Sequence, residues 1–276
     1  MKIGEAMILG LVQGIAEFLP ISSSGHLAIL HNLFNIADIE GSHLFFDVML
    51  HFGTLVAICY VYWNDIKAMF FETLSVITGG KAGKSEGSNL GARLFFLIVI
   101  ASLPLFLVLP VHDYVDSLTQ SSLFVGIALV LTGCMLYVSD RMTPGGKTEK
   151  NMKIKDALIV GLCQVVATLP GLSRSGTTIT AGIATGQDRQ YAVKFSLLMS
   201  IPAVLGATFL EFIKAIKAGI DIKMLPAYLV GTVTAMAVGV LSIKLLKRIS
   251  KNGRFSGFAY YCWVVGVLTV VLSLIF

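Results

Sequence analysis

The sequence predicts an all-α integral membrane protein with six full transmembrane helices and two re-entrant helix–loop–helix hairpins, arranged as an inverted-topology repeat. Three observations support this prediction. Only 13% of the 276 residues are charged and 55% are hydrophobic, whereas soluble domains are about a quarter charged. Six apolar runs are long enough to cross a membrane as helices. Two further apolar regions are interrupted near their middle.

The six full spans are apolar runs of about 18 to 22 residues, which is enough for a helix to cross a hydrocarbon core of about 30 Å. They cover residues 44–63, 94–111, 122–139, 192–213, 225–243 and 257–276. Pro104 and Pro202 lie inside two of these runs and are expected to kink them. We expect no removable signal peptide, because no small-residue cleavage site follows the first apolar stretch.

The two hairpins are residues 4–36 and 156–187, which are apolar but are broken by Pro- and Ser-rich sequence at 20–25 and 170–176. Each arm has about 14 residues, or roughly 21 Å of helix at 1.5 Å per residue. An arm of that length is too short to cross the membrane. Each region is therefore predicted to enter the membrane, turn at depth and leave on the same side.

The two hairpins are copies of one another. Residues 8–25 and 159–176 are identical at eight of 18 aligned positions. We therefore divide the single membrane domain into residues 1–150 and 151–276, each with one hairpin followed by three spans. Because three crossings separate the copies, the second copy is expected to be upside down relative to the first.

The positive charges predict the orientation of the chain in the membrane. Sixteen of the 21 Lys and Arg residues lie in four segments, 64–93, 141–155, 187–194 and 244–254. Basic loops face the cytoplasm, so both termini are expected outside and the two hairpin tips near the membrane midplane. The formal net charge of +5 is explained by this topology, and no nucleic-acid partner is expected.

Each hairpin tip is a loop that leads into a helix, and it supplies hydroxyls, backbone N–H groups and glycine. The residues concerned are Ser22, Ser23, Ser24 and Gly25 in the first tip, and Ser173, Arg174, Ser175 and Gly176 in the second. A helix N-terminus carries about half a positive charge and several unpaired donors, which suits phosphate. Two facing tips can hold a diphosphate. The alternative is that the serines only cap the half-helices.

Arg174 is the strongest indication of an anion site. A charged side chain at membrane depth costs at least about 2.5–3.5 kcal/mol, and a guanidinium fits phosphate oxygens with two parallel hydrogen bonds. The alternative is an ion pair with Glu17 or Asp47, which is also compatible with the resting state of a phosphate site.

Gln13 and Glu17 are four residues apart, so they share one face of the helix that enters the first tip. A carboxylate there repels an incoming phosphate unless it is protonated, holds a divalent cation or acts as a base. The simplest expectation is Mg²⁺ or Ca²⁺ at Glu17 with Gln13 beside it, because hard cations prefer oxygen ligands. Structural pairing of Glu17 with Arg174 is the alternative.

Ser23 and His26 have the spacing of a nucleophile and its base at the start of the second arm. We expect Ser23 to attack with His26 as the proton acceptor, or His26 itself to be the nucleophile. A purely structural histidine is the alternative. Thr178, one turn beyond Arg174, is expected to add a hydrogen-bond donor.

Three other features are interpreted as structural. The segment TGGKAGKS at 78–85 imitates a phosphate-binding loop, but it lacks the first glycine and a preceding strand. His51, one turn after Asp47, is interpreted as packing in preference to lining the site. The four cysteines lie in apolar segments without the spacing of a metal site.

The segments QGIAEFLPISSSGH (13–26) and PGLSRSGTT (170–178) resemble the two signature motifs of the undecaprenyl-pyrophosphate phosphatase family, the bacitracin-resistance type. Length, span count and the FDVMLHFGT segment extend the resemblance over nearly the whole chain. The family's first acidic position falls on Gln13 and its second on Glu17. Its serine and histidine fall on Ser23 and His26, and its SRS on 173–175. The neutral Gln13 departs from a two-carboxylate metal site.

The resemblance implies a hydrolase of the bacterial cytoplasmic membrane that removes the terminal phosphate of the C55 polyprenyl diphosphate carrier of cell-wall synthesis. It implies Mg²⁺ or Ca²⁺ and a site open to the extracytoplasmic side. The substrate and the membrane lipids are the expected partners, and a homodimer is left open. A polyprenyl-phosphate transporter or flippase is the alternative, because inverted repeats with broken half-helices are typical of secondary carriers.

Overall fold

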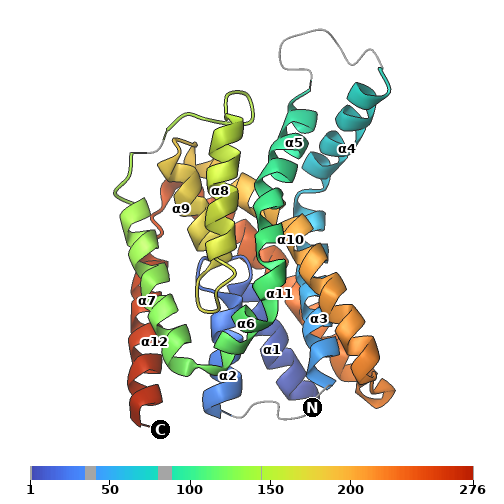
Figure 1. Ribbon diagram of the computed structural model, residues 1–276, viewed down its shortest axis with the longest axis vertical. Coiled ribbons are helices and arrows are strands. Elements are labelled where there is room, and N and C mark those ends of the chain that lie inside the picture. Colours follow the sequence, from blue (N-terminus) through green and yellow to red (C-terminus); the bar gives the residue numbers. More distant parts are fainter. Residues whose placement is uncertain (1, 35–41, 80–88, 144, 276) are drawn as a thin grey trace.

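The computed structural model describes residues 2–34, 42–79, 89–143 and 145–275, and within these ranges the chain is helical with no strand (Figure 1). The all-α prediction is confirmed. In chain order the helices are α1 (Ile3–Ala16), α2 (Ser23–Phe34), α3 (Ser42–Val61), α4 (Trp63–Ile77), α5 (Leu90–Ser102), η1 (Leu103–Leu107), η2 (Leu109–Val111), α6 (His112–Ser117), η3 (Leu118–Gln120), α7 (Ser122–Ser139), α8 (Ile154–Val166), α9 (Arg174–Ala184), α10 (Arg189–Ala218), η4 (Ile222–Met224), α11 (Leu225–Asn252) and α12 (Ser256–Ile275).

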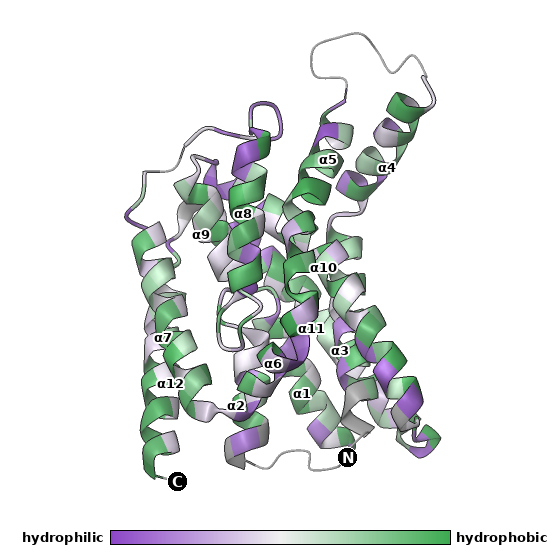
Figure 2. Cartoon of the chain, in the orientation of Figure 1, coloured by the Kyte–Doolittle hydropathy of each residue, from purple (hydrophilic) through white to green (hydrophobic). Residues whose placement is uncertain are grey.

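Five helical segments are long and apolar enough to cross a membrane. They are Leu90–Gln120, Ser122–Ser139, Arg189–Lys217, Ile222–Lys251 and Ser256–Ile275. A sixth candidate is the pair Phe45–Val61 and Trp63–Ile77, which is bent by 77°. Apolar residues run along most of the length of these helices (Figure 2). The lengths and composition are those of a multi-pass membrane protein.

The bend after α3 corrects one expectation. We expected residues 64–93 to form a charged loop, but 63–77 form helix α4. The apolar sequence resumes after Lys67, and Phe70, Phe71 and Ile77 lie exposed on α4. α3 therefore ends at Val61, and the chain continues as a second helix after a 77° bend, with Asp65 in the first turn of α4. Most of the segment 78–85 that imitates a phosphate-binding loop lies outside the described residues.

The two prolines inside spans have different effects. Pro104 lies at the point where α5 gives way to the 3₁₀ helix η1, because proline cannot donate the backbone hydrogen bond that an α-helix requires. Pro202 lies inside α10, and the helix, which is 30 residues long in all, continues past it to Ala218.

The short helices pack against the long ones through glycine. α1 lies along α11, and α8 lies along α5. A Cβ atom added at Gly10 of α1 would be 2.5 Å from the carbonyl oxygen of Gly231 in α11. One added at Gly161 of α8 would clash with the carbonyl oxygen of Ala101 in α5. Both contacts therefore bring two helix backbones together at positions that only glycine can occupy.

The connections between the short helices meet in the middle of the molecule (Figure 1). α1 and α2 are joined by residues 17–22, and α8 and α9 by residues 167–173. A Cβ atom at Gly25 would be 3.0 Å from Cα of Gly171, and Ser175 Oγ donates a hydrogen bond to the carbonyl oxygen of Leu19 at 3.3 Å. The predicted convergence of the two tips is confirmed.

Candidate active site

Each tip ends in a serine that caps the following helix. Ser22 Oγ accepts a hydrogen bond from the Gly25 N–H at 3.2 Å, and Ser173 Oγ accepts one from the Gly176 N–H at 3.1 Å. Such a bond satisfies one of the free donors at a helix N-terminus. Capping thus accounts for Ser22 and Ser173, and it leaves the residues directly after them free for other contacts.

The backbone at Ser22 is in an unusual conformation. Its φ is +73°, and it is the one non-glycine residue with positive φ among those described. Such a conformation is disfavoured for residues with a side chain and is found more often at functional sites than elsewhere. The carbonyl oxygen of Ser22 accepts hydrogen bonds from the backbone N–H and ring Nδ1 of His26, at 3.3 and 2.7 Å. These contacts hold the turn that presents Ser23.

Glu17 is the centre of the site. It follows the last residue of α1, and only 7% of its surface is exposed. Ser23 Oγ donates a hydrogen bond to Glu17 Oε2 at 2.8 Å, and Gln13 Nε2 donates to the same oxygen at 3.1 Å. The carboxylate, not an imidazole, is therefore the group placed to accept the Ser23 proton.

Arg174 reaches across from the second tip and forms an ion pair with Glu17 Oε1. The guanidinium side chain is 23% exposed and the carboxylate side chain 4%. Removing either partner would leave an uncompensated charge, which is expensive in a buried site. The alternative that we kept open from sequence, a Glu17–Arg174 pair, is the one that this structure contains. It joins the two halves of the chain.

The first turns of α2 and α9 present free donors. The backbone N–H groups of Ser23 and Ser24, and those of Arg174 and Ser175, have no hydrogen-bond partner among the described residues. These groups lie at two helix N-termini, where the helix dipoles favour negative charge. With the guanidinium they make the space between the tips suited to an anion with several oxygens.

Gln13 and His51 form one wall of the site. Gln13 is fully buried, and its Nε2 lies 3.1 Å from His51 Nδ1 as well as near Glu17. His51 Nδ1 is also 3.9 Å from Glu17 Oε2. Our interpretation of His51 as packing missed this contact. The only sequence signal was its position one turn after Asp47 on a span that follows the first hairpin.

His26 points away from Ser23. Its Nδ1 bonds the carbonyl oxygen of Ser22, its Nε2 lies 2.8 Å from the Tyr261 hydroxyl, and its ring stacks on that of Tyr261 with centroids 5.6 Å apart. Both ring nitrogens are thus engaged, and neither contacts the Ser23 hydroxyl. Tyr261 lies on α12, far along the chain, and no sequence pattern indicated it.

The remaining predicted residues support the second tip. Ser175 Oγ bonds Ser173 Oγ and the Leu19 carbonyl oxygen. Thr178 Oγ1 donates to the carbonyl oxygen of Arg174 at 2.8 Å and lies 2.6 Å from Ser196 Oγ on α10. The expected extra donor at Thr178 is therefore used within the fold.

The oxygen atoms near Glu17 suit a hard cation. Gln13 Oε1 is buried and has no hydrogen-bond partner in the part of the chain that the structure describes, so one acceptor beside the carboxylate is unused. The Ser23 hydroxyl is a third oxygen within this cluster. Among the described residues, however, the one group of three His, Cys, Asp or Glu ligands is His112, Asp113 and Asp116 on α6. The tips offer a single carboxylate and neutral oxygens.

Comparisons with known proteins identify the family of the chain. The family model described as bacitracin resistance protein BacA matches residues 6–268. An undecaprenyl-diphosphatase of Methanosphaera stadtmanae is 41% identical over 277 residues, covering 98% of each chain. Proteins of the same name from Desulforapulum autotrophicum and Halothermothrix orenii are 38% and 35% identical over 283 and 277 residues, and each alignment covers all of both chains.

Proposed function

The chain belongs to the BacA family of bacitracin resistance proteins, and on this premise we infer that it is an undecaprenyl-diphosphatase. It removes the terminal phosphate of undecaprenyl diphosphate and so regenerates the monophosphate carrier used in cell-wall synthesis. The family description also links the chain to bacitracin resistance. The substrate is a membrane lipid, and a multi-pass helical protein can bind it without extracting it from the bilayer.

One observation supports this function above the others. Glu17 accepts a hydrogen bond from Ser23 of one tip and forms an ion pair with Arg174 of the other. A nucleophile, a proton acceptor and a phosphate-binding cation are thus connected at the junction of two helix N-termini. Phosphoryl transfer depends mainly on positioning and on electrostatic stabilisation of the transferred group, and this cluster supplies both.

In the first step the terminal phosphate replaces Glu17 as the partner of Arg174. The guanidinium and the free N–H groups of α2 and α9 hold its oxygens. Ser23 Oγ attacks the terminal phosphorus, and its proton passes to Glu17. The bond from that phosphorus to the bridging oxygen breaks, and the polyprenyl monophosphate leaves.

In the second step water hydrolyses the phosphoserine. The proton that Glu17 took up in the first step leaves with the polyprenyl monophosphate, so the carboxylate is free to accept a proton from the attacking water. Glu17 passes this proton to Ser23 Oγ as the P–Oγ bond breaks. The sum is one water consumed, one inorganic phosphate released and the serine restored. His26, held between Ser22 and Tyr261, positions the turn that carries Ser23.

We propose Mg²⁺ or Ca²⁺ as the cofactor, held by Glu17, Gln13 Oε1 and the substrate oxygens. The unused Gln13 oxygen supports this proposal. Such an ion would neutralise charge on the diphosphate. Because Gln13 is neutral, most of the cation's ligands must come from the substrate and water, as is usual for Mg²⁺ at phosphate sites.

We further propose that the chain is an inverted repeat of residues 1–150 and 151–276 in the cytoplasmic membrane, with α1–α2 and α8–α9 as re-entrant hairpins. Gly10 and Gly161 are equivalent in the repeat, and each packs against the second span of the opposite half. The basic segments lie together, since Lys147 bonds Thr185 and Arg189 bonds Gly253 through carbonyl oxygens. That end is cytoplasmic, and the active site opens to the other side.

The function is tested with purified protein and a short-chain polyprenyl diphosphate in detergent containing Mg²⁺. We expect one phosphate released per lipid and a monophosphate as the lipid product, with both lost in Glu17→Gln. Tight binding of the lipid without phosphate release would refute the assignment. That result would favour the transporter alternative, which the inverted placement of the two half-helix pairs also suits.

A further inference from the structure

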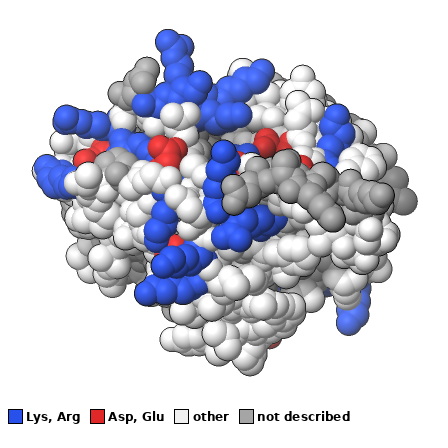
Figure 3. Space-filling view, turned by 90° about the horizontal axis from the view of Figure 1, so that it is seen from above, with Lys and Arg blue, Asp and Glu red and all other residues white. Residues whose placement is uncertain are grey.

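A cluster of Lys and Arg side chains lies at the basic end of the molecule, away from the two tips. The last turns of α11 and the end of α3 enclose a cleft of about 540 Å³. It is lined by Tyr60, Val61, Lys244, Lys247, Arg248 and Lys251. Viewed from this end, many Lys and Arg side chains gather on the surface (Figure 3). Four cations thus share one cleft, and no carboxylate of the described residues lines it.

The charges of this cleft are not balanced within the fold. Lys244, Lys247, Arg248 and Lys251 form no ion pair with any described carboxylate. Lys247 instead lies over the ring of Tyr62, with Nζ 4.7 Å from its centroid. Helix positions 244, 247, 248 and 251 share one face, so the cations point together. An anion bound among them would relieve their mutual repulsion.

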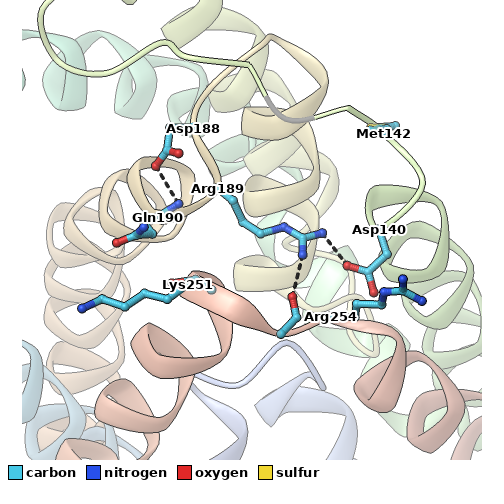
Figure 4. Close-up of a pocket in the computed structure, with 9 residues that line it drawn as sticks. Asp140, Met142, Asp188, Arg189, Gln190, Lys251 and Arg254 are labelled. Atoms are coloured by element: carbon cyan, nitrogen blue, oxygen red, sulfur yellow. Dashed lines mark hydrogen bonds and ion pairs between the residues drawn. The ribbon is translucent and has the colours of Figure 1, made fainter.

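The neighbouring cavity is different. It has a volume of about 420 Å³ and also contains Lys251, but Asp140 and Asp188 line it (Figure 4). Arg189 there pairs with Asp140 at 2.5 Å and bonds the Gly253 carbonyl oxygen. Arg189, the central cation of this cavity, therefore already has a carboxylate partner, and the ion pair is interpreted as structural. The cations of the cleft next to it have no such carboxylate partner among the described residues.

The surroundings of the cleft indicate a lipid as the source of the anion. Tyr60 and Trp63 at its α3 side are 70% and 56% exposed, as is typical of aromatic residues at a membrane–water interface. On α11, Leu241 lies one turn before Lys244 and Leu245 directly follows it, and these leucines are 66% and 46% exposed. A ligand that places a phosphate among the cations would have its acyl chains along these apolar side chains.

We propose that this cleft is a binding site for a phosphate-bearing lipid headgroup, held by Lys244, Lys247, Arg248 and Lys251. Basic pockets between transmembrane helices recognise anionic headgroups in this way, and arginine adds a bidentate contact to phosphate oxygens. The inference does not depend on the proposed hydrolytic reaction, because no residue of the tips takes part. It assigns the molecule a second lipid contact, at the opposite end from the proposed opening of the active site.

The test compares two double variants of equal charge. Lys244→Gln with Arg248→Gln removes two cations of the cleft. Lys150→Gln with Lys155→Gln removes two exposed cations, one just before α8 and one in its first turn. Retained lipid is measured by native mass spectrometry after exchange into phosphatidylglycerol, a polyprenyl monophosphate or phosphatidylcholine. Melting temperature in detergent with each lipid, or with millimolar inorganic phosphate, gives an independent reading of binding.

We expect the wild type to retain either phosphate-bearing anionic lipid over phosphatidylcholine, and the cleft variant to bind it about 10- to 30-fold more weakly. The control variant should bind within about threefold of wild type, and the swap Lys244→Arg with Arg248→Lys should keep binding. Phosphate release should stay within about twofold in all of them. Equal losses in both double variants, no lipid preference, or full replacement of the lipid by inorganic phosphate would each overturn the proposal.

Discussion

Ser23 and Arg174 occupy equivalent positions in the two tips, and they bind the two oxygens of one carboxylate. Each directly follows the serine that caps its helix. Ser23 donates to Oε2 of Glu17 and Arg174 pairs with Oε1. The repeat thus supplies the same geometry twice, and the difference between serine and arginine gives one tip the nucleophile and the other the cation.

Replacing Ser23 by alanine should abolish turnover, because it removes the attacking oxygen. We expect phosphate release from a polyprenyl diphosphate to fall by at least about 10³-fold. Ser24→Ala is the matched control, since Ser24 is exposed and its hydroxyl contacts only Ser22 among the described residues. It should retain activity within a fewfold. A phosphorylated Ser23 peptide, found by mass spectrometry after acid quenching, would identify the intermediate. Near-normal turnover by Ser23→Ala would contradict the mechanism.

Two replacements of Arg174 distinguish the contribution of its charge to phosphate binding from that of its planar guanidinium. Arg174→Ala should lower phosphate release by about 10³-fold or more, and it should also destabilise the protein because Glu17 is left buried without its partner. Arg174→Lys keeps the charge but not the planar fork, so we expect an intermediate loss with a melting temperature near wild type. Arg141→Ala, which removes an exposed arginine stacked on Tyr137, should keep full activity. A fully active Arg174→Ala protein would exclude its role in phosphate binding.

Introducing a carboxylate at Gln13 should strengthen cation binding. In Gln13→Glu a second acidic ligand stands beside Glu17, and we expect half-maximal activity at roughly tenfold less Mg²⁺ or Ca²⁺. The control is Gln164→Glu, at the equivalent position in α8, where Gln164 is also buried. That variant should lose stability without any change in metal dependence. An unchanged metal titration in Gln13→Glu would place the cation elsewhere.

Gly10 should tolerate no side chain, because its Cβ would lie 2.5 Å from a carbonyl oxygen of α11. We expect Gly10→Ala to cost about 1–3 kcal/mol, seen as a lower melting temperature in detergent. Gly4 is in the same helix, but a Cβ atom added there would have no heavy atom of the described residues within 4 Å. Gly4→Ala should therefore be neutral or slightly stabilising. Equal melting temperatures for the two variants would show that α1 and α11 are not packed this closely.

The carboxylate of Asp156 gives the fold a defined acid sensitivity. Burial alone would raise the pKa of Asp156, but hydrogen bonds from Lys147 Nζ and the Lys153 N–H and the charges of these lysines outweigh it. The pKa therefore lies below its ordinary value of 3.8. A lowered pKa means that the stabilisation is complete above pH 3.8 and is lost as the pH falls further.

Asp156→Asn tests this linkage. We expect its melting temperature to lie a few degrees below that of wild type from about pH 8 to about pH 5, and the difference to narrow below about pH 4. Glu149→Gln, on a half-buried residue of the same segment, should show no such convergence. A difference that persists unchanged at about pH 3 would contradict the assignment.

The sequence by itself determined the all-helical fold class and the apolar character of its helices, and it singled out the residues of both tips. Hydrophobic composition and run length decide these features, because a membrane span needs about 20 apolar residues wherever it lies in a fold. The sequence also indicates Gln13, Glu17, Ser23 and Arg174 as candidate site residues. Polar and charged side chains are costly at membrane depth, so they stand out in an apolar sequence.

Only the tertiary structure decided which of these groups touch. Ser23 and His26 have the spacing of a catalytic pair, but in the structure His26 contacts Tyr261 and Ser23 contacts Glu17, after a turn in which Ser22 has a positive φ. His51 and Tyr261 join the site from α3 and α12 through contacts between distant parts of the chain. Local spacing fixes which side chains share a helix face, whereas the partner of each side chain depends on how separate helices pack, and no single stretch of sequence contains that information.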